Sequence, residues 1–352
     1  MMEKLYDFKA KPTSLWLTVN RSCNFRCKWC YAECAGFKSS DDMPLIMAKR
    51  IANIVHDTEV KHITLIGGEP TLWPSLFKFN DYCKTLPINV GMVTNACLFG
   101  NDEFWSRFLK NPFKSLGISV KGINEKQFAE TVGTSNLYSE TLLGIKRLLN
   151  YYPNKGVSVV YSNLVSPEEV EEITERSHEM GAKSFQLSSC SVTLDDQGYN
   201  SDYSLQIEQF VDGLIQVYPR LHELYDGNIL IEPRLPLCVF PASFLKKVRE
   251  RKQLLNVCHV QNRSGIVFDT DGSILPCNSM VGIKIGKLDE DFSTGEELLT
   301  FLNNSRLIDD YREMLRYPSD ECLQCKLNDI CRGGCIQNWL ALEPKICHAF
   351  HE

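Results

Sequence analysis

Residues 15–31 read LWLTVNRSCNFRCKWCY, and this stretch decides how the chain is interpreted. Its opening residues are mostly apolar or β-branched and predict a short buried strand. Cys23, Cys27 and Cys30 follow directly on one loop. Three thiolates so close together can hold one inorganic iron–sulfur cluster and leave a ligand position open, as a catalytic zinc site does. From spacing alone, a zinc site completed by Cys34 and incidental buried cysteines remain alternatives.

Segments typical of strands and helices alternate through the first two hundred residues. Amphipathic stretches such as 138–149 lie between the strands, and Ser166, Pro167 and Glu169 predict a helix start with a capping box. Alternation repeated about six times predicts a parallel α/β sheet, open or curved, with ligands at the carboxyl ends of its strands. The predicted strands are 15–20, 62–66, 90–94, 116–120, 157–161 and 184–188.

The composition is that of an ordinary globular protein of 352 residues, with 43% hydrophobic residues and 15 cysteines. A net charge of −6 without a basic run disfavours a nucleic-acid partner. No apolar segment resembles a signal core or a membrane span, so we expect a cytoplasmic protein. In a reducing compartment the cysteines favour metal binding or catalysis over disulfides.

The motif Cx3CxxC after a first strand resembles the signature of the radical S-adenosylmethionine (AdoMet) superfamily. Gly67-Gly68-Glu69-Pro70, at the end of the second predicted strand, is similar to that family's GGEP motif. The resemblance implies a partial (β/α)6 barrel, bound AdoMet and a [4Fe–4S] cluster on Cys23, Cys27 and Cys30.

The resemblance also implies which residues contact AdoMet. Glu69 would hold the ammonium group and Trp29 would lie beside the adenine, although a core tryptophan is the alternative. Lys121 stands where many relatives carry aspartate, and no arginine lies between Gly122 and Lys146. We therefore expect Lys121 to pair with the AdoMet carboxylate, a solvated lysine being the alternative. The implied cofactor-binding residues are Trp29, Gly67, Gly68, Glu69, Pro70, Asn95, Ser119 and Lys121.

A second group of cysteines follows residue 230. Residues 265–277 predict a hairpin around an Asp-Gly turn that ends at Cys277. In isolation the later Cx2Cx5Cx3C run is also compatible with a zinc ribbon. With the barrel, the whole pattern resembles the SPASM extension of peptide- and protein-modifying relatives. The matching positions are Cys258, Gly272, Cys277, Cys322, Cys325, Cys331, Cys335 and Cys347.

The SPASM resemblance implies two auxiliary [4Fe–4S] clusters, and so three clusters in all. One would be held by Cys322, Cys325, Cys331 and Cys347. The other would be held by Cys258, Cys277 and Cys335. Cys238 is the candidate for the fourth ligand of this cluster. The alternative is that Cys238 is a small buried apolar side chain without a ligand role. The predicted domains are an extension at 1–14, the barrel at 15–205, a helical bridge at 206–240 and the SPASM domain at 241–352.

The implied activity is reductive cleavage of AdoMet to a 5′-deoxyadenosyl radical, which abstracts hydrogen from a ribosomally made peptide or a protein residue. Cross-link formation, dehydrogenation and epimerisation are the possible outcomes. Maturation of a sulfatase-type active site or synthesis of a small cofactor is the alternative within the same chemistry, and a non-enzymatic zinc-binding adaptor is the alternative outside it. Expected partners are the precursor peptide or protein, a flavodoxin- or ferredoxin-type electron donor and a separate leader-peptide-binding protein. Cys190 and Cys97 follow predicted strands and are candidate hydrogen donors, although buried cysteine is the commoner role.

Overall fold

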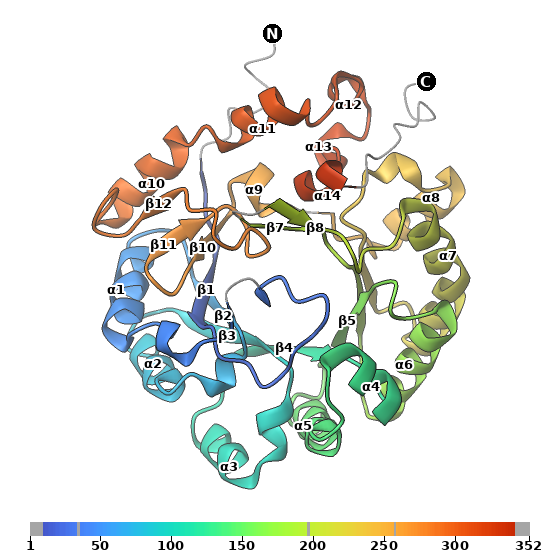
Figure 1. Ribbon diagram of the computed structural model, residues 1–352, viewed down its shortest axis with the longest axis horizontal. Coiled ribbons are helices and arrows are strands. Elements are labelled where there is room, and N and C mark those ends of the chain that lie inside the picture. Colours follow the sequence, from blue (N-terminus) through green and yellow to red (C-terminus); the bar gives the residue numbers. More distant parts are fainter. Residues whose placement is uncertain (1–9, 34–35, 196–197, 257, 342–352) are drawn as a thin grey trace.

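The central feature of the computed structural model is a curved sheet whose convex side is covered by helices (Figure 1). The structure describes residues 10–33, 36–195, 198–256 and 258–341. Six parallel strands form the middle of the sheet in chain order. They are β1 (Ser14–Asn20), β2 (His62–Gly67), β3 (Asn89–Thr94), β4 (Ser115–Val120), β5 (Val157–Tyr161) and β6 (Phe185–Ser189).

Helices connect these strands across the outer face, as right-handed β–α–β crossovers require. They are α1 (Leu45–His56), α2 (Leu76–Cys83), α3 (Asp102–Lys110), α4 (Glu125–Val132), α5 (Tyr138–Tyr151) and α6 (Pro167–Glu179). In α5 the residues Ile145, Leu148 and Leu149 are buried against the sheet, as the amphipathic pattern predicts. The capping box of Ser166 and Glu169 is formed at the start of α6. The predicted α/β class and partial barrel are therefore confirmed.

The described sheet is wider than the six predicted strands. β9 (Ile229–Glu232) pairs in parallel with β6, and β10 (Gly265–Phe268) pairs in parallel with β1. The segment 206–240, predicted as a helical bridge, thus contains a helix, α7 (Ile207–Leu224), and a strand of the main sheet. Ile229 and Ile231 alternate with half-buried neighbours in β9, which is the pattern of an edge strand facing the core. The domain boundaries remain a prediction.

The predicted hairpin after residue 264 continues the sheet at its other edge. β10 pairs antiparallel with β11 (Ser273–Leu275), which pairs with β12 (Gly286–Lys287). The Arg21 guanidinium, at the end of β1, forms a buried ion pair with Asp269 of this hairpin. The C-terminal part is therefore tied directly to the loop that carries Cys23.

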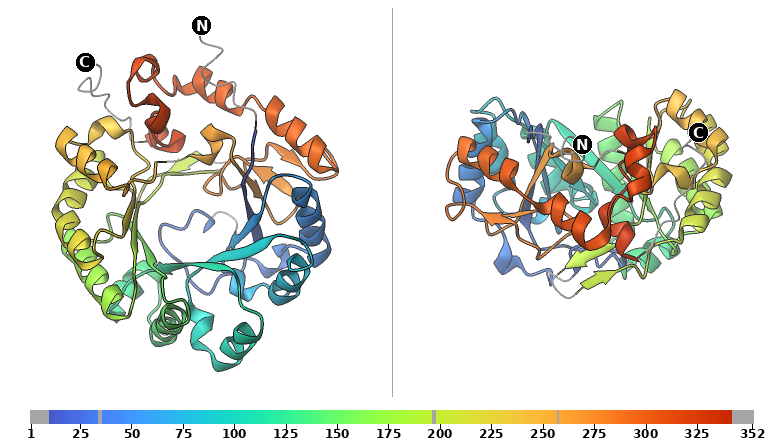
Figure 2. Two further views of the ribbon diagram at one scale, coloured as in Figure 1. Left: turned by 180° about the vertical axis from the view of Figure 1, so that it is seen from behind. Right: turned by 90° about the horizontal axis from the view of Figure 1, so that it is seen from above.

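Short helices occupy the open side of the arc, between the β10–β12 edge and α8 (Figures 1 and 2). None of the helices in the described part of the chain is long and apolar enough to cross a bilayer. Besides the short hairpin of β7 (Thr193–Asp195) and β8 (Gly198–Asn200), the remaining elements are helical. The helices are α8 (Ala242–Glu250), α9 (His259–Asn262), α10 (Gly295–Asn304), α11 (Leu307–Leu315), α12 (Asp320–Gln324), α13 (Asn328–Cys331) and α14 (Ile336–Ala341).

Candidate active site

The loop with Cys23, Cys27 and Cys30 follows β1 and lies inside the arc of strands (Figure 1). Its start is held by the turn after β2. Gly68 N donates to Asn20 O at 3.0 Å, and Glu69 N donates to Ser22 O at 2.8 Å. A Cβ atom on Gly68 would overlap the Ser22 carbonyl. Glycine is therefore required where the two strand ends pass each other.

Glu69 is buried and connects two strand ends. Its Oε1 accepts hydrogen bonds from Thr71 N (3.2 Å), Thr71 Oγ1 (2.7 Å) and Thr94 Oγ1 (2.7 Å). Its Oε2 accepts one, from Asn95 N at 2.8 Å. Burial raises the pKa of Glu69, and the hydrogen bonds from Asn95, Thr71 and Thr94 oppose that rise. A carboxylate oxygen has two lone pairs, so Oε2 can accept one more donor, such as a ligand ammonium group.

The thiols of Cys23, Cys27 and Cys30 are partly buried on this loop. Burial raises the pKa of Cys23 to about 12 and the pKa values of Cys27 and Cys30 to about 11. Lys121 opposes the rise at Cys27 and Cys30. Such thiols become thiolates when a metal binds them, because the metal replaces the lost hydration of the charge.

Three cysteine thiolates on one loop are ligands of the kind that an iron–sulfur cluster takes. Over the described ranges, no three His, Cys, Asp or Glu side chains are arranged to hold one metal ion. A zinc ion draws its thiolates to about 2.3 Å from one centre. A cluster contains several iron ions and takes its thiolates farther apart. The zinc alternative therefore has no geometric support in this part of the chain.

Lys121, Ser119 and Trp29 meet at the mouth of the barrel. Lys121 Nζ donates to Ser119 Oγ at 2.7 Å and lies 4.1 Å from the centroid of the Trp29 ring. Asn95 Nδ2 donates to Asn24 Oδ1 at 2.8 Å, which ties the end of β3 to the cysteine loop. Pro70 begins a 3-10 turn, Pro70–Leu72, that Glu69 caps. The structure thus gathers the residues predicted to bind AdoMet around the three cysteines.

The two predicted hydrogen donors have different surroundings. Cys97 is buried with Phe25 and Phe128 behind the cysteine loop. Cys190 lines a cavity of about 230 Å³ together with Trp29 and Cys30. Burial raises the pKa of Cys190 to about 11, with Arg234 and Lys121 opposing. Its thiol is therefore neutral at pH 7, and only this candidate borders the cavity.

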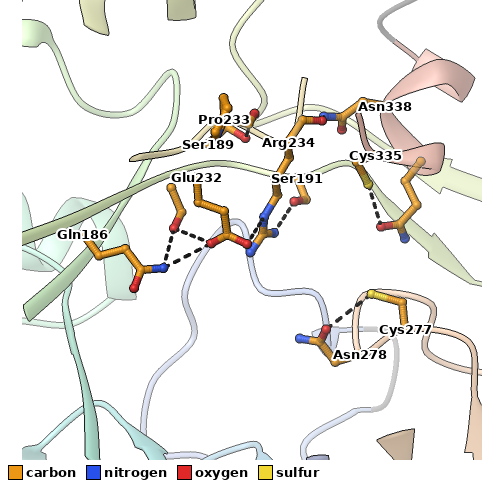
Figure 3. Close-up of polar contacts among 12 residues, drawn as sticks. Gln186, Ser189, Ser191, Glu232, Pro233, Arg234, Cys277, Asn278, Cys335 and Asn338 are labelled. Atoms are coloured by element: carbon orange, nitrogen blue, oxygen red, sulfur yellow. Dashed lines mark hydrogen bonds and ion pairs between the residues drawn. The ribbon is translucent and has the colours of Figure 1, made fainter. Parts of the chain in front are cut away.

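Arg234 and its partner Glu232 were missed by the sequence reasoning, and the Arg234 guanidinium interacts electrostatically with the Cys277 and Cys335 thiols (Figure 3). Arg234 Nε donates to Glu232 Oε1 at 3.2 Å, and the guanidinium also donates to Ser191 Oγ. Burial alone would lower the pKa of Arg234, but Glu232, Cys335 and Cys277 raise it. The sequence did contain a signal for this pair. Two opposite charges, Glu232 and Arg234, directly follow the apolar run 229–231.

Glu232 is held by three donors. Besides Arg234, it accepts from Ser188 Oγ at 2.8 Å and from Gln186 Nε2 at 3.2 Å (Figure 3). Burial would raise the pKa of Glu232, but Arg234 and these hydrogen bonds hold it below its usual value. Glu232 therefore fixes the position of the Arg234 guanidinium, which is the charged group of the pair that interacts with Cys277 and Cys335.

The C-terminal cysteines fall into two groups. Cys258, Cys277 and Cys335 are neighbours, because burial together with the Cys335 and Cys277 thiols raises the pKa of Cys258 to about 12. The second group lines another cavity and consists of Cys238, Cys322, Cys325 and Cys331.

Cys238 had been predicted to join Cys258, Cys277 and Cys335, and the structure instead places it in the second group. The reason is the path of the chain after β9. The 3-10 turn Leu237–Val239 lies against α13, where Leu237 N donates to Cys331 Sγ at 3.1 Å. Cys34 and Cys347 lie outside the described residues.

Comparison with known proteins gives both partial and nearly full-length matches in sequence, and a match in fold over the whole chain. Residues 17–176 match the Radical SAM superfamily. A probable GTP 3′,8-cyclase of Thermococcus kodakarensis is 24% identical over 42% of this chain, and the match spans 47% of that enzyme. The chain thus matches about half the length of this relative.

Two further proteins match over nearly the whole chain. A cysteine-type anaerobic sulfatase-maturating enzyme of Clostridium perfringens is 24% identical over 92% of this chain and 89% of its own length. The crystal structure of Streptococcus suis SuiB bound to its precursor peptide SuiA covers 100% of this chain and 77% of SuiB, with a TM-score of 0.68 and 18% identity. That likeness shows a shared fold.

The superfamily match covers β1 to α6, which includes the cysteine loop, the Gly67–Pro70 turn and Lys121. Enzymes of this superfamily use AdoMet and a [4Fe–4S] cluster, and the buried thiols and the partly satisfied Glu69 carboxylate fit both. Residues 17–176 therefore form a radical SAM domain, and the chain is similar to enzymes of that superfamily.

Proposed function

We propose that this enzyme modifies a residue of a ribosomally made peptide or of a protein. When bound, the [4Fe–4S] cluster supplies one electron for the reductive cleavage of AdoMet, which in turn enables hydrogen abstraction from the substrate. Cys23, Cys27 and Cys30 would hold this cluster. Glu69 would accept from the AdoMet ammonium group, and Lys121 would donate to the AdoMet carboxylate.

One observation carries the proposal: a cavity joins the cysteine loop to the wall opposite. Trp29 and Cys30 line one side of it, and Cys190, Leu194 and Tyr203 line the other. A side chain that enters this cavity would lie between the predicted AdoMet residues and Cys190. Reacting groups held together in this way need little further ordering before reaction.

The cavity wall is connected to the region of Cys258, Cys277 and Cys335. Leu194, on the short hairpin of β7 and β8, donates its N–H to Ser279 O at 3.1 Å, two residues after Cys277. We infer that a substrate in the cavity would lie near the auxiliary cluster on Cys258, Cys277 and Cys335. A cluster near the substrate suits a reaction that must remove an electron from it, such as cross-link formation or dehydrogenation.

Two of the relatives that match over nearly the full chain support a polypeptide substrate, whereas a third is named a Fe-coproporphyrin III synthase of Methanosarcina barkeri. SuiB was solved with a precursor peptide, and the Clostridium perfringens relative is a sulfatase-maturating enzyme. Both of these descriptions involve a polypeptide, and we favour this substrate class for that reason.

The experiment is hydrogen transfer from a candidate peptide encoded beside the gene. The peptide is made with all its carbon-bound hydrogens, including the α-hydrogens, replaced by deuterium, and it is incubated anaerobically with enzyme, AdoMet and dithionite. Deuterium in 5′-deoxyadenosine and a mass change of the peptide are expected. The proposal would be contradicted if the peptide gave unlabelled 5′-deoxyadenosine and stayed unchanged, while a deuterated small molecule gave labelled 5′-deoxyadenosine.

A further inference from the structure

We propose that Cys238 is the fourth thiolate ligand of the auxiliary cluster bound by Cys322, Cys325 and Cys331. This inference rests on the proposed iron–sulfur function and changes the ligand set that the sequence pattern implies. Four cysteines line one cavity, and a [4Fe–4S] cluster is commonly held by four cysteine thiolates. The set is then complete within the described part of the chain.

The backbone brings Cys238 to this cavity by two hydrogen bonds. Cys335 N donates to Arg234 O at 2.9 Å, and Leu237 N donates to Cys331 Sγ at 3.1 Å. These contacts fix residues 234–237 along the loop that connects Cys331 with Cys335. Cys238 is the next residue, so its position is fixed by the same contacts.

Close packing of Gly334 against the backbone of Pro236 holds these two segments together. Gly334 has a φ of +79°, and a Cβ atom there would lie 2.6 Å from Pro236 N. Only glycine lets the two backbones approach so closely. Pro236 then begins the 3-10 turn Leu237–Val239 that carries Cys238.

The sulfur atoms of the other three cysteines accept hydrogen bonds, as ligand thiolates do. Cys331 Sγ accepts from Leu237 N, as described above. Leu327 N donates to Cys325 Sγ at 3.4 Å. Ser319 Oγ donates to Cys322 Sγ at 3.4 Å. Donors of this kind stabilise negative sulfur and fix the orientation of metal ligands. Leu237 and Leu327 also line the cavity and limit the access of water.

The test compares Cys238→Ala with Cys238→Ser. A serine oxygen can ligate iron, whereas alanine cannot, and the two side chains are similar in size. After anaerobic reconstitution we expect Cys238→Ala to lose about four irons and matching sulfide per chain. We expect Cys238→Ser to keep most of that iron with an altered electron paramagnetic resonance spectrum of the reduced protein. Cys83→Ala, at a buried position in α2, is the matched control and should equal wild type.

Three results would overturn the inference. Wild-type iron content and spectrum in Cys238→Ala would show that this thiol is not a ligand. Wild-type iron content and an unchanged spectrum in Cys238→Ser, beside iron loss in Cys238→Ala, would indicate a packing role. If Cys347→Ala loses iron and Cys238→Ala keeps the wild-type iron content, the fourth ligand position belongs to Cys347. Absence of iron from wild-type protein would instead refute the proposed iron–sulfur function itself, so the two failures are distinguishable.

Discussion

Lys121 Nζ lies 4.1 Å from the centroid of the Trp29 ring, and this contact joins the end of β4 to the cysteine loop. A cation above an aromatic face is stabilised by about 0.5–2 kcal/mol, depending on its exposure. The same ammonium group donates to Ser119 and lies near enough to Cys27 and Cys30 to oppose the rise in their pKa values. Lys121 is thus fixed at the mouth of the barrel.

The first prediction concerns AdoMet binding. Lys121→Ala should weaken the affinity for AdoMet roughly tenfold or more, because a charge-assisted hydrogen bond contributes about 1.5–3 kcal/mol. Lys121→Arg keeps the charge and should lose much less. Anaerobic equilibrium dialysis measures both affinities. An alanine variant that binds AdoMet as tightly as wild type would leave Lys121 with a structural role at Trp29 only.

The second prediction separates epimerisation from oxidative chemistry. Cys190 borders the cavity and its thiol carries its hydrogen at neutral pH, so it is the candidate donor to a substrate radical. If the enzyme is an epimerase, turnover in D2O should place deuterium at a product α-carbon, and Cys190→Ala should abolish this incorporation. Mass spectrometry of the peptide measures both.

Cys97→Ala is the matched control for that experiment, since Cys97 is buried away from the cavity. A product lighter by two hydrogens, formed equally well by the Cys190 variant, would end the donor role. It would favour cross-link formation or dehydrogenation.

The third prediction concerns the positive charge beside Cys277 and Cys335. Arg234→Gln should lower the midpoint potential of the neighbouring auxiliary cluster, because a cation stabilises the more negative reduced state. Each 1 kcal/mol of lost interaction corresponds to about 40 mV for a one-electron couple. Arg234→Lys keeps the charge and is the control. A potentiometric titration that gives equal potentials for wild type and Arg234→Gln would exclude this electrostatic role.

Much of the barrel could be predicted from the sequence. Short apolar or β-branched segments between amphipathic helical stretches located all six central strands within one residue at each end, because a parallel sheet covered by helices buries such segments. The capping box at Ser166 and the hairpin before Cys277 were also predicted, since local hydrogen bonds and an Asp-Gly turn determine them.

Contacts between distant segments could not be predicted in the same way. β9 pairs with β6 only because α7 brings it back to the sheet edge, and four residues carry too little periodicity to reveal this. The position of Cys238 depends on Gly334 packing against Pro236, which are almost a hundred residues apart in sequence. Arg234 and Glu232 were missed because their role comes from thiols on other segments.

The most direct test of the central claim is the metal content and AdoMet cleavage of reconstituted protein. We predict three [4Fe–4S] clusters, about twelve irons per chain, and formation of 5′-deoxyadenosine with dithionite. Replacing Cys23, Cys27 and Cys30 together by alanine should leave about eight irons and abolish 5′-deoxyadenosine. Wild-type protein that binds stoichiometric zinc and little iron, or a triple variant that still forms 5′-deoxyadenosine, would contradict the account.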